Sequence, residues 1–279
     1  MQQSAQVCII TGAASGIGRA LALELGRRGA TVVVTDIDAA GAETVASTIN
    51  AGRAGKAVAQ ALDVTDAAAV TELVANTCAS YGRLDLIFNN AGIAVTGDMR
   101  DLSLAHWRRV IDVNLLGVVY GTDAAYKVMA AQGHGHIINI ASLAGLTPFP
   151  TNAPYSTTKH AVVGLSQSAR AEGEDLGVRV SVVCPGFIDS NIYTASEAVN
   201  VPREQLLGQI PLRKVPADLA AMRILDGVLR NEAVIVFPAY ARIMWWLYRL
   251  FPALIAPLGR RMIRDLRKIR VPDTSKRGS

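Results

Sequence analysis

The 279-residue chain is long enough to bury a substantial core. Hydrophobic residues make up 51% of it and charged residues only 18%, and this composition argues against extensive disorder. Its net charge of +5 is concentrated at one end. Residues 239–279 hold ten Lys/Arg against two Asp (+8), whereas the other 18 basic and 21 acidic side chains give −3, which disfavours a nucleic-acid-binding body.

Short β-branched runs alternate with longer helical patterns along the chain. The runs predict seven strands, at 7–10, 31–35, 56–62, 84–88, 136–140, 179–183 and 233–237. The helical patterns predict helices at 16–28, 39–51, 66–81, 104–132, 153–176 and 218–229. This alternation indicates an α/β fold, a doubly wound, seven-stranded parallel sheet with helices on both faces. Because no linker-like stretch precedes Pro238, we predict one domain over residues 1–238 and a separate extension over 239–279.

The cellular location is suggested by the cysteines and by the first residues. Cys8, Cys78 and Cys184 lack the spacing of a disulfide framework or a metal site, which is typical of free thiols in a reducing compartment. The chain begins with no charged n-region and no small-residue cleavage site. We therefore expect a cytoplasmic protein without a secretory signal.

A glycine-rich turn, TGAASGIG at residues 11–18, follows the first predicted strand and opens the first predicted helix. Gly12, Gly16 and Gly18 would permit a tight turn and the close approach of a pyrophosphate to the backbone at a helix N-terminus. A plain strand-to-helix turn is the alternative, but the strand and helix that a dinucleotide site requires are both predicted here.

Asp36 ends the second predicted strand. A carboxylate at that place accepts hydrogen bonds from the adenosine ribose hydroxyls and repels a 2′-phosphate, and neither Ser15 nor Ile37 supplies a cation to receive one. The pattern favours NAD over NADP, although a solvated acid at a strand end would look the same.

Candidate chemical groups follow in the second half of the chain. Tyr155 and Lys159 are spaced i, i+4, on one face of a predicted helix, where an ammonium would lower the pKa of the phenol. Ser142 follows the fifth predicted strand, at the edge where parallel sheets present ligand-binding groups. Asn114 lies among apolar residues of a predicted helix. It is either a core amide with satisfied hydrogen bonds or a site that holds a water or a backbone kink.

Together these motifs resemble the signature of the short-chain dehydrogenase/reductase family in its single-domain Rossmann-fold form. The resemblance covers residues 7–237 and rests on TGAASGIG, Asp63-Val64, Asn89-Asn90-Ala91-Gly92, Asn114, Ser142, Tyr155-x-x-x-Lys159 and Pro185-Gly186.

The resemblance implies roles for these residues. Tyr155 would be the general acid in reduction and the general base in oxidation, with Lys159 lowering its pKa and holding the nicotinamide ribose. Ser142 would bind the substrate oxygen, and Asn114 would support a proton relay through water. Ser190 stands where the family often has a Thr that contacts the nicotinamide. The implied cofactor contacts are Gly12, Ser15, Gly16, Ile17, Gly18, Asp36, Asp63, Val64, Asn90, Ala91, Gly92, Tyr155, Lys159, Pro185, Gly186, Ile188 and Ser190. No metal is needed, because the cofactor carries the hydride.

The substrate wall is expected near these groups and in the Pro-containing segment 190–216, a loop of a length typical of lids and binding segments. The candidate wall residues are Val95, Leu143, Leu146, Phe149, Phe187, Ile192, Tyr193, Leu206 and Ile210. They are mostly apolar and include no Arg or Lys to clamp a carboxylate or phosphate, so we predict a hydrophobic alcohol or ketone, such as a steroid, terpenoid, aryl or long-chain compound. We also expect a homodimer or homotetramer.

The extension 239–279 carries apolar residues at helical spacing with arginines beside them, and Pro252 and Pro257 would break or bend any helix there. Three interpretations remain open: the apolar stripe packs on its own or a partner subunit, lies in a membrane interface, or covers the substrate pocket. Two rival functions also remain: an NADPH-dependent ketoreductase of the same family, and a non-catalytic nucleotide-binding protein anchored by its basic tail.

Overall fold

The computed structural model describes residues 6–52, 54–190, 192, 196–207 and 214–271, and it contains the predicted sheet. Seven parallel strands pair in the order β11-β7-β6-β4-β1-β2-β3. Their bounds are β1 Val7–Thr11, β2 Thr31–Asp36, β3 Lys56–Ala61, β4 Leu86–Asn89, β6 Gly135–Ile140, β7 Val178–Pro185 and β11 Val234–Phe237. The central strands are buried on both faces, which explains why they read as continuous apolar runs in the sequence.

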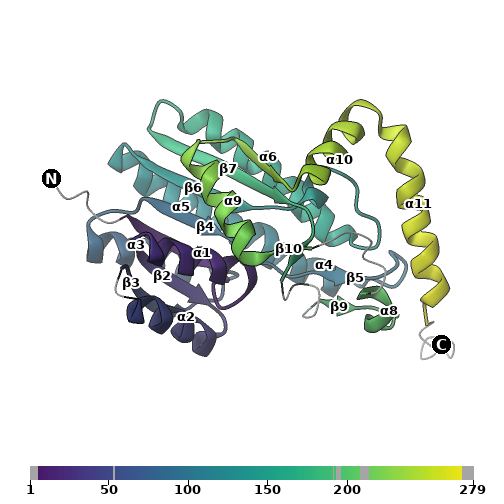
Figure 1. Ribbon diagram of the computed structural model, residues 1–279, viewed down its shortest axis with the longest axis horizontal. Coiled ribbons are helices and arrows are strands. Elements are labelled where there is room, and N and C mark those ends of the chain that lie inside the picture. The colour runs from purple at the N-terminus through teal and green to yellow at the C-terminus, as the bar shows by residue number, and fades with distance from the viewer. Residues whose placement is uncertain (1–5, 53, 191, 193–195, 208–213, 272–279) are drawn as a thin grey trace.

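Helices cover both faces of this sheet, as Figure 1 shows. On one face, α1 (Gly16–Arg27), α2 (Ala39–Ala51) and α9 (Ala217–Leu229) share a hydrophobic cluster with the strands. On the other face, α3 (Ala67–Tyr81) and α5 (Gly117–Gln132) form a second cluster, and α6 (Ala153–Gly173) belongs to a third. The fold is therefore the doubly wound Rossmann type. The strand order changes direction between β1 and β4, and ligands bind at the carboxyl ends of the strands at such a switch point.

The helix predicted over residues 104–132 is interrupted. It consists of α4 (Leu104–Ile111), a π-helical turn η1 (Asp112–Leu116) and α5. Asn114 lies in the π-turn and is fully buried, so the helix is kinked at this residue. Its side-chain amide is also hydrogen-bonded, so the structure fits the satisfied core amide as well.

Short elements surround the carboxyl end of the sheet. They are the two-residue strands β5 (Val95–Thr96), β8 (Ile188–Asp189), β9 (Glu197–Ala198) and β10 (Val215–Pro216), the 3₁₀ turn η2 (Leu143–Gly145) and the helix α8 (Arg203–Leu207). β5 pairs with β9 and β8 pairs with β10, which ties residues 197–198 and 215–216 to residues that follow β4 and β7. Two-residue strands leave no periodicity, so the sequence patterns did not predict them.

The extension forms two helices, α10 (Ala239–Leu250) and α11 (Pro252–Ile269), which Figure 1 shows at one end of the molecule. Pro252 stands in the first turn of α11, where its missing N–H leaves no gap in the hydrogen bonding, and Pro257 is accommodated inside the helix.

Both helices pack on their own chain. Ala241 of α10 is buried in the third cluster, with Tyr240, Met244 and Trp245 against it. Leu266 of α11 is buried as well. The interpretation that the extension packs on its own subunit is therefore correct for one face of these two helices. Within the described residues, no helix is both long and apolar enough to span a membrane.

Candidate active site

The glycine-rich turn brings β1, α1 and β4 into close contact. Gly12 has φ +65°, a conformation in which a side chain is strained, and a Cβ there would lie 2.8 Å from the Cα of Ala91. A Cβ on Gly18 would lie 2.2 Å from the Gly12 carbonyl oxygen, so only glycine lets α1 begin this close to the turn. The first turn of α1 contains no acidic residue, and its N-cap Ser15 makes no side-chain capping bond. The helix N-terminus is thus suited to an anionic group.

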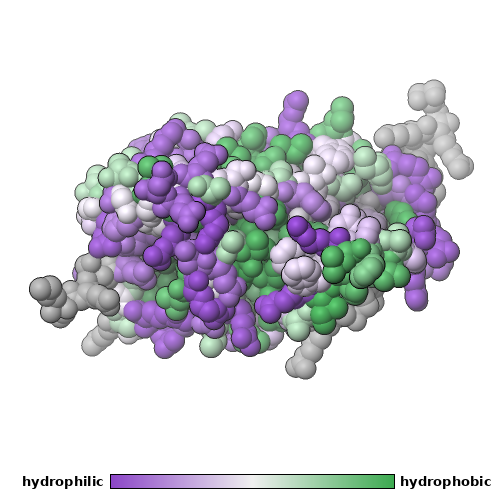
Figure 2. All heavy atoms as spheres, turned by 90° about the horizontal axis from the view of Figure 1, so that it is seen from above, coloured by the Kyte–Doolittle hydropathy of each residue, from purple (hydrophilic) through white to green (hydrophobic). Residues whose placement is uncertain are grey.

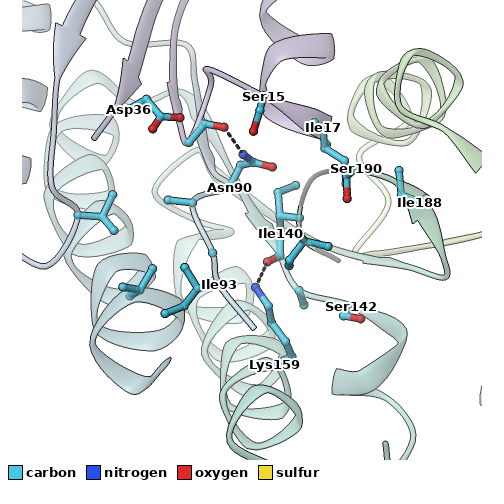
Figure 3. A pocket seen from close by; sticks show the side chains of 18 of the residues that line it. Ser15, Ile17, Asp36, Asn90, Ile93, Ile140, Ser142, Lys159, Ile188 and Ser190 are labelled. Atoms are coloured by element: carbon cyan, nitrogen blue, oxygen red, sulfur yellow. Dashed lines mark hydrogen bonds between the residues drawn. The ribbon is translucent and has the colours of Figure 1, made fainter. Parts of the chain in front are cut away.

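Asn90 fixes this turn from the neighbouring strand. Its side-chain amide donates hydrogen bonds to the carbonyl oxygens of Thr11 (2.9 Å) and Gly12 (3.0 Å). The Thr11 hydroxyl in turn accepts the backbone N–H groups of Asn90 and Ala91. Asn90 therefore positions the glycine turn in addition to facing the cavity beside it (Figure 3).

Asp36 lies at the far end of the same crevice. Its carboxylate accepts the backbone N–H groups of Ala14 (2.9 Å) and Asp38 (3.0 Å), one on each oxygen, which fixes its orientation beside the glycine turn. The next residue, Ile37, is 75% exposed and brings no positive charge. Each carboxylate oxygen retains a lone pair that can accept a further hydrogen bond.

A cavity of about 360 Å³ connects Asp36 with Tyr155. Every cofactor residue that the sequence predicted lines this cavity except Gly18, which lies behind the turn. Residues that sequence reasoning missed also line it: Ile37, Leu62, Ile93, Val113, Ile140 and Ala141. Most of them are next to a motif residue in the chain, and this position was the one feature of the sequence from which they could have been predicted.

Tyr155, Ser142 and Lys159 meet at the other end of the cavity. Ser142 follows β6 and caps η2 by accepting the Ala144 N–H at 3.1 Å. Lys159 is buried and donates to the carbonyl oxygen of Ile140 at 2.8 Å, as Figure 3 shows. Its ammonium nitrogen lies 5.5 Å from the centroid of the Tyr155 ring. The i, i+4 spacing thus places both groups beside one another, as expected.

The pKa of Tyr155 differs in direction from the sequence-based expectation. Burial raises it above its usual value, and a hydrogen bond with Ser142 only partly opposes this. Burial also lowers the pKa of Lys159 to about 8. The pKa of Tyr155 is therefore not lowered as the spacing to Lys159 led us to expect, because burial removes water from the charged phenolate. Tyr155 therefore keeps its proton at neutral pH.

Asn114 approaches the site from the π-turn. Its side-chain oxygen accepts the Ile93 N–H at 2.8 Å, and its amide donates to the Ile93 carbonyl at 2.8 Å. A Cβ on Gly92 would lie 3.3 Å from the Asn114 side-chain oxygen and 3.6 Å from the Lys159 nitrogen. Asn114 thus holds the segment after Asn90 against Lys159.

The Pro185-Gly186 segment forms the opposite wall and rests on the extension. The hydroxyl of Tyr240 accepts the backbone N–H of Phe187 at 2.7 Å, and a Cβ on Gly186 would lie 2.4 Å from that hydroxyl. Ser190 lies over the glycine turn, since a Cβ on Gly16 would lie 3.2 Å from the Ser190 Cβ. A residue of the C-terminal extension therefore shapes the crevice, and the sequence patterns gave no sign of this.

Among the described residues that were predicted to form the substrate wall, only Ile192 lines the cavity. Phe149 and Phe187 form a tilted ring pair with centroids 5.9 Å apart, but neither lines the cavity. Val95 and Leu143 are buried, and neither they nor Leu146 line the cavity. The side chain of Leu206, and all of Tyr193 and Ile210, lie outside the described residues.

Comparisons with known proteins agree with this geometry. The model of the short chain dehydrogenase family matches residues 6–200. Cyclohexanol dehydrogenase of an Acinetobacter species is 36% identical over 79% of this chain and 88% of its own length. The crystal structure of a short chain dehydrogenase/reductase from Burkholderia phymatum in complex with NAD superposes with a TM-score of 0.78, at 27% identity, over 98% of both chains.

A further relative is longer than this chain. The "Probable oxidoreductase EphD" of Mycobacterium tuberculosis is 34% identical over 90% of this chain but only 44% of its own length, so the chain spans less than half of that relative.

A sheet with a dinucleotide crevice and a Tyr–Lys–Ser cluster defines a nicotinamide-type oxidoreductase. The chain belongs to the short-chain dehydrogenase/reductase family, whose members act on CH–OH groups.

Proposed function

We propose that the protein is an NAD-dependent dehydrogenase that interconverts a hydrophobic secondary alcohol and its ketone. The observation that carries the proposal is one cavity that joins the Asp36 carboxylate to the hydroxyl of Tyr155, with Ser142 and Lys159 beside it. These residues fit a bound nicotinamide dinucleotide, which when bound would accept or supply the hydride.

Proton transfer falls to Tyr155. Because its pKa is raised, the phenol is protonated at neutral pH and can donate its proton to a ketone oxygen, while in the oxidative direction the tyrosinate takes the proton of the alcohol. Ser142, which is hydrogen-bonded to Tyr155, is placed to share the substrate oxygen. The nearby Lys159 ammonium stabilises the tyrosinate left after proton donation.

The preference for NAD rests on Asp36. Its carboxylate is held by two backbone N–H groups at the mouth of the crevice, and Ile37 follows it without a cation. Ribose hydroxyls can donate to this carboxylate, whereas a 2′-phosphate would meet a like charge. An NADPH-dependent ketoreductase would need a compensating cation, and neither Ser15 nor Ile37 provides one.

The apolar character of the substrate rests on the residues nearest the chemistry. Ile93, Ile188 and Ile192 line the cavity, and all three side chains are apolar. A relative named for its action on cyclohexanol supports a cyclic or otherwise apolar secondary alcohol. No arginine or lysine other than Lys159 is among the described residues that line this cavity.

The test is an absorbance assay for NADH. Purified protein is incubated with NAD and a panel of secondary alcohols that includes cyclohexanol, steroid, aryl and long-chain compounds, and the same panel is run with NADP. Turnover of at least one apolar alcohol with NAD supports the proposal. Turnover with NADP alone would identify the NADPH-dependent alternative. If calorimetry shows that NAD binds but no alcohol or ketone on the panel reacts, the non-catalytic alternative is favoured.

A further inference from the structure

The helix α10 has apolar side chains on two opposite faces. Its inner face, with Ala241 and Met244, packs on the third cluster. Its outer face carries Ile243, Trp246 and Leu250, spaced i, i+3 and i+7, and all three are exposed. Because the inner face already packs on the body, the apolar outer face leaves large hydrophobic side chains in water, and covering it would be favourable.

The first half of α11 continues this outer face. Phe251 at the junction is 57% exposed, and Leu254 and Leu258, one turn apart, are 66% and 46% exposed. The inner side of α11 instead carries Leu266, which is buried against the body. We call the exposed set of Ile243, Trp246, Leu247, Leu250, Phe251, Leu254 and Leu258 the corner face.

The exposed hydrophobic side chains of this protein are clustered at the corner face and not scattered evenly over the surface. Of 17 exposed large hydrophobic side chains among the described residues, seven lie within residues 243–258. Figure 2 shows apolar side chains gathered over the end of the molecule where Figure 1 places the turn from α10 to α11. Contiguous exposed apolar surface of this kind marks an interaction site, whereas single exposed residues elsewhere need no explanation.

Exposed arginines border the corner face. Arg242 and Arg249 come from α10, and Arg260, Arg261 and Arg264 follow Leu258 on α11. In the part of the chain that the structure describes, Arg249, Arg260 and Arg264 form no ion pair, and Arg261 has only a 3.7 Å contact with Asp265. Their charges are therefore available to an external anionic surface.

We propose that the corner face docks this protein on an anionic lipid surface. An amphipathic helix binds a membrane interface by inserting apolar side chains while cations meet the headgroups. Trp246 suits the headgroup level, because indole combines an apolar body with an N–H donor. A second copy of this chain fits less well, because a two-fold contact would place one set of arginines against the other. The proposal is independent of the catalytic assignment.

The structure also explains how docking and folding can coexist. The inner face keeps the extension attached, through the third cluster and through Arg267 and Arg270, which pair with Asp98 and Asp101 of the body. The outer face remains available. Since deleting the extension would expose its inner contacts, the test requires substitutions of outer-face residues and not a truncation.

The test is co-sedimentation of the full chain with vesicles of phosphatidylcholine, with and without phosphatidylglycerol, at low and high salt. We expect binding to the anionic vesicles at low salt and a loss of at least about tenfold in partitioning at high salt. Leu254→Ser with Leu258→Ser should weaken partitioning about tenfold or more, since two exposed apolar groups are lost. Arg260→Gln, Arg261→Gln and Arg264→Gln together should weaken it on the order of a hundredfold.

Matched substitutions outside the corner face serve as controls. Leu229→Ser and Arg223→Gln alter exposed residues of α9 and should leave partitioning unchanged. The fluorescence of Trp246 should shift to shorter wavelength on anionic vesicles, and Trp246→Phe should remove most of that shift. Circular dichroism and sedimentation velocity of each variant show whether it remains folded and in what oligomeric state.

Two results would overturn the proposal. One is a wild-type protein that ignores anionic vesicles at low salt, or binds them equally well when the corner-face leucines are replaced. The other is a wild-type oligomer that does not bind vesicles and that dissociates with Leu254→Ser and Leu258→Ser, which would assign the corner face to a second copy of the chain.

Discussion

The cofactor crevice and the C-terminal extension hold their residues in place by different means. In the crevice, side chains bond to the backbone of neighbouring strands, as Asn90 does to Thr11 and Lys159 does to Ile140. The extension is held by helix packing and by ion pairs between residues 169 positions apart. The crevice therefore depends on individual hydrogen-bonding groups, whereas the extension depends on packed apolar surface and on paired charges. Substitutions should accordingly have different effects: those in the crevice should affect catalysis, and those where the extension meets the body should affect stability.

The largest effect is expected in the crevice. Tyr155→Phe keeps the ring and removes the proton donor, so turnover should fall by about 10²–10⁴-fold while NAD affinity stays within a few fold. Steady-state rates and calorimetric titration with NAD measure the two quantities. A variant that retains more than a tenth of the wild-type turnover would remove Tyr155 from the proposed mechanism.

A smaller effect is expected for cofactor choice. The proposed role of Asp36 predicts that kcat/KM with NAD exceeds that with NADP by on the order of a hundredfold, which corresponds to about 3 kcal/mol. Asp36→Ala with Ile37→Arg should narrow or reverse the ratio, because the like charge is removed and a cation is added. Asp38→Ala is the matched control: it removes a neighbouring carboxylate that caps α2 and should leave the ratio unchanged. Equal use of both cofactors by the wild-type protein would contradict the assignment.

The fold and most of the crevice were predictable from the sequence, because each imposes a local pattern. Buried parallel strands need continuous apolar runs, and a turn with the φ of Gly12 strongly favours glycine. The i, i+4 spacing of Tyr155 and Lys159 survives in α6 because a helix fixes which side chains are neighbours.

The rest depended on contacts between distant residues. The π-turn around Asn114 interrupts a sequence with continuous helical spacing, and the hydrogen bond between Tyr240 and Phe187 joins two segments that no motif connects. The direction of the Tyr155 pKa shift depends on how deeply the fold buries the phenol, which spacing along a helix does not reveal. The extension was ambiguous because both faces of α10 are apolar, so a single stripe did not indicate which one packs.

The smallest effect is expected where the extension meets the body, at Asp98. Its side chain is 1% exposed and accepts hydrogen bonds from Arg267 (2.7 Å) and from the guanidinium of Arg100 (2.9 and 3.1 Å). The pairing with Arg100 is the main cause that holds the pKa of Asp98 below its usual value, and Arg267 adds to it. Both arginines are at least half exposed, so solvent screens part of the interaction. Asp98→Asn should therefore lower the free energy of unfolding by about 1–3 kcal/mol at pH 7.

This loss should depend on pH in a defined direction. Because the pKa of Asp98 is lower in the folded than in the unfolded chain, folding favours the ionised carboxylate, and its stabilisation is fully present above the unfolded pKa of about 4. It disappears as the pH falls toward the folded pKa, so the difference between wild type and Asp98→Asn should shrink from pH 7 to pH 3.5. Urea unfolding at both pH values measures it. Asp123→Asn, which removes an exposed partner of Lys127, should change stability by less than about 0.5 kcal/mol at either pH. If the loss of stability for Asp98→Asn did not change with pH, the charge of Asp98 would not hold the extension to the body. Packing of the inner face would then be the means by which the extension is held.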